Sequence, residues 1–99
     1  MTWNISHGGT KNGYSYSGVS ELGDEVKRVV GWREWRHLKV IFDRRSGDPF
    51  AVPPRKAQQV ATALLQTVGL LPADFAAMAV QIRESAFRAA GRNEPWEWS

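Results

Sequence analysis

Two apolar helical stripes joined by a very short link constrain the fold of this chain more than any other feature. The first stripe begins at Pro54 and the second at Pro72, and in each the apolar side chains recur every three or four residues. Gly69 ends the first stripe and Gly91 ends the second. Because only residues 69–71 separate the two helices, the sequence predicts an antiparallel helical hairpin.

One more helix is expected in the first half of the chain. Ser17 is suited to cap it, its apolar positions follow helical spacing, and Gly31 stands where the helix should end. Directly afterwards, Trp32, Trp35 and Leu38 recur every three residues. This spacing predicts a short helical turn that buries both indole rings and exposes the basic residues between them.

Strand signals lie outside these helical segments. Residues 3–5 alternate apolar and polar side chains, as in a short strand with one apolar face. Apolar residues alternate again on both sides of Gly47, which predicts a β-hairpin near residues 38–52. Trp96 and Trp98 alternate in the same way, and chain ends are often neighbours. We therefore expect the C-terminal tail to pair beside the first strand or to lie across the helices.

These elements predict a single α+β domain over residues 1–99. A small antiparallel sheet, built from the N-terminal strand, the hairpin and in one version the C-terminal tail, should carry three helices, the last two forming the antiparallel hairpin. The chain is long enough for a hydrophobic core, and five tryptophans with 42% hydrophobic residues argue against disorder. There is no cysteine, so this core must hold the fold without disulfides.

Catalytic and cofactor chemistry has little support in the sequence. The two histidines, His7 and His37, have no second histidine, cysteine or carboxylate at metal-ligand spacing. The glycine-rich segment 8–13 lacks the phosphate-loop pattern, although its backbone amides could cradle an anion. We expect no enzymatic activity, no cofactor and no metal. A small-ligand or enzyme site at His7 and the glycine-rich loop is kept as a third alternative.

The positive charge of the chain is concentrated in one segment. The formal net charge is +3, but residues 27–45 contain seven basic and two acidic residues, a local excess of five positive charges. Arginine interleaved with tryptophan is typical of grooves that bind nucleic acid through phosphates and base faces. The alternative is that the arginines only solvate the surface beside core tryptophans. The candidate nucleic-acid-binding residues are Arg33, Arg36, Lys39, Arg44 and Arg45.

The high number of tryptophans leads to the first hypothesis for function. Each indole can bury on the order of 200 Å², so Trp96 and Trp98 either anchor the C-terminal tail in the core or contact a partner. With no catalytic constellation, the sequence favours a small non-enzymatic protein-interaction module, regulatory or accessory, with an unknown protein partner. The alternative is weak nucleic-acid binding by residues 27–45. The candidate protein-contact residues are Trp32, Trp35, Trp96 and Trp98.

Three stretches, WNISHGG, SGDPFAVPP and EPWEWS, resemble a family of small uncharacterised proteins from high-GC actinobacteria. The resemblance spans most of the chain. It implies one compact domain of bacterial origin. Because that family has no known activity, the resemblance implies no substrate, cofactor or catalytic residue.

No membrane or export signal is recognisable in the sequence. The most apolar region, residues 68–80, is interrupted by Pro72 and Asp74 and is too short to span a bilayer. The first residues lack a basic segment followed by an apolar core. We therefore expect a cytoplasmic protein without membrane contact, either a monomer or a homodimer.

Overall fold

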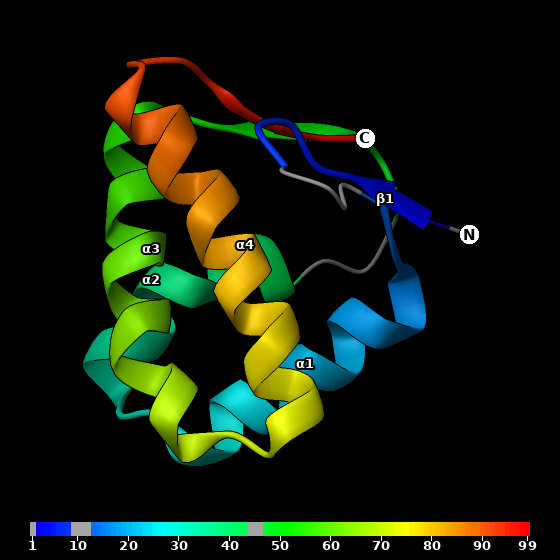
Figure 1. The fold of residues 1–99 in the computed structure, drawn as a ribbon, viewed down its shortest axis with the longest axis vertical. Helices are drawn as coiled ribbons and strands as arrows, with labels where there is room; N and C mark the ends of the chain where they lie inside the picture. The colour runs from blue at the N-terminus through cyan, green and yellow to red at the C-terminus, as the bar shows by residue number, and fades with distance from the viewer. Residues whose placement is uncertain (1, 9–12, 44–46) are drawn as a thin grey trace.

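The two C-terminal helices form the antiparallel hairpin that the sequence predicts (Figure 1). In the computed structural model, α3 spans Pro54–Thr67 and α4 spans Ala73–Gly91, with one 3-10 turn, Val68–Leu70, between them. The structure describes residues 2–8, 13–43 and 47–99. Small side chains on the buried faces let the two helices pack closely. They are Ala57 and Ala61 on α3 and Ala79, Ala86 and Ala89 on α4.

The first helix, α1, spans Tyr16–Val29 and lies against α2. Its cap is Ser15 rather than Ser17, because the Ser15 hydroxyl accepts a hydrogen bond from the Gly18 amide at 3.0 Å. Gly23 allows a close approach to α2. A Cβ atom at Gly23 would lie 3.0 Å from the Cβ of Phe42, the last residue of α2, so a larger side chain would push the two helices apart.

The predicted β-hairpin near residues 38–52 is wrong. Residues 32–42 form a helix, α2 (Trp32–Phe42), and only Phe50–Val52, β3, is a strand. The segment LKVIF is apolar at adjacent as well as alternate positions, so its pattern fits a helix as well as a strand. The helical conformation is favoured because Leu38 and Ile41, three residues apart, then both enter the core.

The strands form two small antiparallel sheets instead of the single sheet expected. β1 (Thr2–Asn4) pairs with β2 (Gly13–Ser15), and β3 pairs with β4 (Trp96–Trp98). The described residues thus contain four α-helices and two two-stranded sheets rather than three helices on one sheet. The α+β class itself is confirmed.

The two ends of the chain are joined to each other. Ile5 forms an isolated antiparallel bridge with Trp98. Asn4 and Ser99 exchange backbone hydrogen bonds of 2.7 and 2.9 Å. The expectation that the C-terminal tail pairs beside the first strand is therefore confirmed, and Figure 1 shows the tail running beside β1.

An aromatic cluster fills the space between these strands and the helices. Trp98 stacks on Phe50 with ring centroids 5.5 Å apart, and it meets Trp3 and Trp96 edge-on at 5.8 and 5.2 Å. Both C-terminal indoles are 0% exposed. They are among the largest fully buried side chains of the described residues, so they anchor the C-terminal tail.

The indole of Trp96 depends on one buried serine. Its Nε1 donates a hydrogen bond to the hydroxyl of Ser85 at 3.1 Å, and that hydroxyl donates to the carbonyl oxygen of Ile82 at 2.8 Å. In Ser85→Ala the indole N–H stays buried without an acceptor, so we expect the free energy of unfolding to fall by about 1–2 kcal/mol in urea denaturation. The control is Thr62→Ala, which removes an exposed hydroxyl that bonds only to its own helix and should change stability by less than about 0.5 kcal/mol. Equal losses in the two variants would contradict the role given to Ser85.

Candidate functional site

Trp32 and Trp35 have different environments, and the prediction that both rings are buried is wrong for Trp32. The Trp32 side chain is 71% exposed, whereas Trp35 is half-buried and stacks on Phe42 with centroids 6.4 Å apart. An α-helix has 3.6 residues per turn, so a strict three-residue repeat rotates around its surface. Leu38 lies on the buried face of α2. Trp32, six residues earlier, therefore lies on the exposed face.

Cationic side chains share the exposed side of α2 with Trp32. Lys39, two turns along the helix, places its Nζ 6.0 Å from the centroid of the Trp32 ring. Arg36 lies one turn after Trp32, and together with Lys39 it lines a shallow depression that Lys56, from the first turn of α3, also reaches. We define the basic surface as Trp32, Arg33, Arg36, Lys39 and Lys56.

The four cations of the basic surface form no ion pair with any residue that the structure describes. Glu34 and Asp43 are the carboxylates that line the same depressions, which leaves four cations against two carboxylates. Arg44 and Arg45, the two remaining candidates, lie outside the residues that the structure describes. An unpaired positive excess of this kind attracts an anionic ligand.

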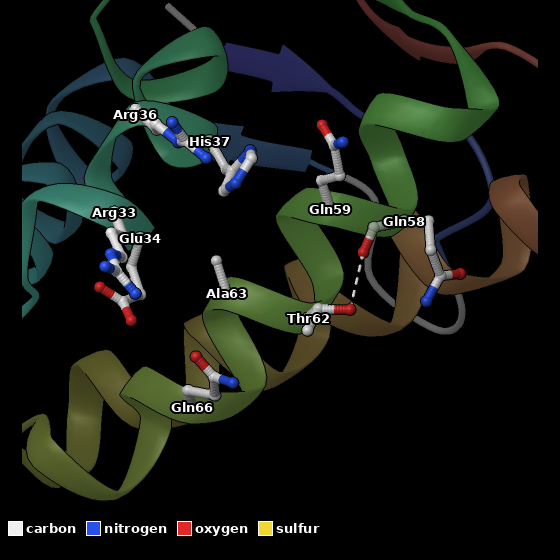
Figure 2. A pocket seen from close by; sticks show the side chains of 9 residues that line it. All are labelled: Arg33, Glu34, Arg36, His37, Gln58, Gln59, Thr62, Ala63 and Gln66. Carbon is white, nitrogen blue, oxygen red and sulfur yellow. Dashed lines mark hydrogen bonds between the residues drawn. The ribbon is translucent and has the colours of Figure 1, made fainter.

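A groove of about 350 Å³ runs between α2 and α3 beside this surface (Figure 2). Its α3 wall is mostly polar: Gln58, Thr62 and Gln66 recur every fourth residue, and the Thr62 hydroxyl donates a 3.0 Å hydrogen bond to the Gln58 carbonyl oxygen. Its α2 wall is charged. The lining residues are Arg33, Glu34, Arg36 and His37 on α2, and Gln58, Gln59, Thr62, Ala63 and Gln66 on α3.

This groove offers both charge and hydrogen-bonding groups. The guanidinium groups can bind phosphate oxygens, and the amide side chains can donate to or accept from the edge of a base. The polar α3 wall of this groove was not predicted from the sequence. The signal was present, because the polar residues of α3 at positions 58, 62 and 66 lie on one helical face, away from the apolar stripe. That this face lies beside the basic residues of α2 follows only from the tertiary packing.

The two C-terminal tryptophans do not reach the surface. Because Trp96 and Trp98 are fully buried, a partner cannot contact them while the domain is folded. Of the four candidate protein-contact tryptophans, only Trp32 presents most of its ring to solvent.

The described residues around His7 do not support the third alternative, a small-ligand or enzyme site at His7 and the glycine-rich loop. His7 has a left-handed backbone (φ 59°), and its carbonyl oxygen accepts a 2.6 Å hydrogen bond from Nε of Arg88, which ties the N-terminal segment to α4. Residues 9–12 of the loop lie outside the described part of the chain. Burial raises the pKa of the Tyr14 phenol, opposed in part by Arg88, so the hydroxyl stays protonated and donates to Gln81 at 3.1 Å. These contacts are structural.

Two further properties follow from the described residues. They contain no group of three or more histidine, cysteine, aspartate or glutamate side chains arranged to hold a metal ion. None of their helices combines the length and the apolar character that crossing a bilayer requires.

Comparison with known proteins gives one match. A family model described as a domain of unknown function, DUF7739, covers residues 8–99. No curated protein and no solved structure matches the chain. The family description names no catalytic activity, which agrees with the expectation of a family without known function. Because the model covers nearly the whole chain, this protein belongs to the DUF7739 family.

Proposed function

We propose that this protein binds single-stranded nucleic acid through the basic surface and the adjoining groove between α2 and α3. The observation that carries the proposal is the exposed indole of Trp32, which lies among unpaired cations. A large apolar ring that stays exposed to water does not contribute the free energy that its burial would contribute. A base stacked on that ring restores this contribution, while neighbouring arginine and lysine side chains bind the phosphates.

The arrangement favours a single strand over a duplex. A base can lie flat on an exposed indole only where it is not already stacked between two neighbours in a double helix. The groove that Arg33 and Arg36 of the basic surface line has a volume of about 350 Å³, with arginine on one wall and glutamine on the other. An exposed indole accepts any base face, and a glutamine amide can both donate to and accept from base edges, so we expect weak and largely sequence-independent binding.

The same proposal takes the protein to be non-enzymatic, cytoplasmic and of actinobacterial origin. The first rests on the lack of a catalytic constellation in the sequence, and the second on the lack of cysteine, which fits a reducing compartment. The third rests on the resemblance of the three sequence stretches described above.

A protein-interaction module is the second candidate. The exposed Trp32 ring, with Arg33, Arg36 and Lys39 on the same helix, would also suit an acidic peptide carrying one aromatic or aliphatic anchor. Burial of Trp96 and Trp98 removes half of the contact residues on which this hypothesis was based. For this reason we rank it second.

Substituting Trp32 tests the stacking role. Trp32→Ala should weaken binding to a labelled oligo-deoxythymidine about 5- to 150-fold in fluorescence anisotropy, because one stacked base contributes about 1–3 kcal/mol. Trp32→Phe keeps an aromatic face and should retain most of the affinity. Both variants should melt within a few degrees of the wild type, since the ring is mostly exposed.

The competing outcomes of this experiment are distinct. Wild-type affinity in Trp32→Ala would overturn the stacking role. A polyglutamate chain that competes for the site as well as the oligonucleotide does would favour the acidic-peptide candidate over nucleic acid.

A further inference from the structure

The groove between α2 and α3 contains His37, a side chain that can change its charge near neutral pH. On α2 it comes one turn after Arg33 and directly after Arg36. Residues four apart on a helix have Cβ atoms about 5–6 Å apart, so the imidazole and the Arg33 guanidinium share one face of α2. In Figure 2 the His37 ring lies on the side of α2 that faces α3. It can therefore contact the same ligand as the two arginines.

The ring nitrogens of His37 have no partner among the described residues. Within these residues the imidazole forms neither an ion pair nor a hydrogen bond. The residue is half-buried, so part of its ring still reaches solvent. A protonated imidazole donates hydrogen bonds from both nitrogens, and a neutral one donates from a single nitrogen. His37 thus has donor capacity that the protein does not use and that protonation increases.

The charged groups of α2 around His37 favour an anion beside it. Arg33 and Arg36 are cations, and Glu34 is the carboxylate among the described residues that line the groove. The Glu34 carboxylate turns toward the start of α2, because a Cβ atom at Gly31 would lie 3.0 Å from its Oε2. Gly31 precedes His37 by six residues, which is about 9 Å along the helix axis. Glu34 is therefore not placed to pair with the imidazole.

The helices that pack against α2 leave this charge balance unchanged. The α3 residues that line the groove are all uncharged, and Lys56 of α3 lines the neighbouring depression instead. On α1, the Lys27 Nζ lies 5.5 Å from the centroid of the Trp35 ring. Two arginines and one glutamate give the described lining of the groove a net charge of +1, and protonation of His37 raises it to +2.

We propose that His37 is a third phosphate-binding residue of this groove and that it binds in its protonated form. The inference rests on the proposed function, since the phosphate is that of the bound single strand. The bound anion stabilises the charged imidazole, so ligand binding and proton uptake strengthen each other. An imidazole in water gains its proton as the pH falls through about 6.5, whereas arginine and lysine are already charged at higher pH. Nucleic-acid binding should therefore become tighter as the pH falls.

The pH dependence of the affinity for labelled oligo-deoxythymidine tests this role. Fluorescence anisotropy measures it from about pH 8 to about pH 5.5, a range in which neither thymine nor a phosphodiester exchanges a proton. Wild-type binding at about 50 mM salt should tighten at least about 3-fold toward the lower pH, as expected for one partly exposed charge contact. The salt slope should become steeper by about 0.7, which corresponds to one more phosphate contact to a single strand.

Three variants isolate the imidazole. His37→Gln keeps a polar side chain that cannot be protonated, so its affinity should change little with pH and stay below that of the wild type at about pH 5.5. His37→Lys is charged throughout and should bind more tightly than the wild type at about pH 8. The matched control is His7→Asn, which removes the other histidine and keeps a residue that tolerates the left-handed backbone at that position (φ 59°). It should retain the wild-type pH profile.

The outcomes separate this inference from the proposed function. Wild-type affinity that is equal at both ends of the pH range, or an unchanged pH profile in His37→Gln, would overturn the role of His37 and leave nucleic-acid binding standing. A wild type that binds the oligonucleotide at no pH would overturn the proposed function, and the role of His37 with it.

Discussion

Replacing Trp96 by alanine is expected to lower the free energy of unfolding by about 3–5 kcal/mol, a large part of the total for a domain of this size. The indole is completely buried, packs edge-on against Trp98 at 5.2 Å and donates its N–H to Ser85. Trp98→Ala should cost a similar amount, because Trp98 also stacks on Phe50. Urea denaturation followed by circular dichroism measures both losses.

Phenylalanine at the two positions separates ring packing from hydrogen bonding. The N–H of Trp98 is buried without an acceptor among the described residues, whereas that of Trp96 bonds to Ser85. Trp98→Phe removes an unsatisfied donor and should therefore be less destabilising than Trp96→Phe, which loses a hydrogen bond and leaves Ser85 without its donor. Losses below about 1 kcal/mol in both alanine variants would show that the C-terminal tail does not belong to the core.

The helical hairpin was predictable because its signals are local. Proline at the start, glycine near the end and apolar residues every three or four positions define α3 and α4 without reference to the rest of the chain. The segment 38–42 was misassigned because its apolar residues fit both periods. The strand that pairs with β3 is β4, more than 40 residues later, and no local pattern indicates which of two distant segments will pair.

The candidate site was predictable in part. Arg33, Arg36 and Lys39 were identified from charge and do lie on the surface of α2. Lys56 and the glutamines were not, since they join the site only through the packing of α3 beside α2. The ring of Trp32 was expected in the core but is exposed. The three-residue spacing of Trp32, Trp35 and Leu38 is close to the 3.6-residue turn of an α-helix but does not match it.

The most direct test of nucleic-acid binding by the basic surface compares two variants. One loses two positive charges from this surface, and the other loses two positive charges elsewhere. Arg36→Gln/Lys39→Gln takes two cations from the proposed interface. Arg28→Gln/Arg92→Gln takes two from exposed positions outside it, on α1 and after α4. All four side chains are solvent-exposed, so neither double variant should alter stability by more than about 0.5 kcal/mol per site.

The measurement is the affinity for oligo-deoxythymidine by fluorescence anisotropy between about 50 and 200 mM salt. The account predicts that wild-type affinity falls steeply over this range. It predicts that Arg36→Gln/Lys39→Gln binds more weakly and has a salt slope shallower by about 1.4, corresponding to two lost phosphate contacts to a single strand. The Arg28→Gln/Arg92→Gln control should keep the wild-type slope. Equal losses in the two double variants, or no binding by the wild type at about 50 mM salt, would contradict the assignment of nucleic-acid binding to this surface.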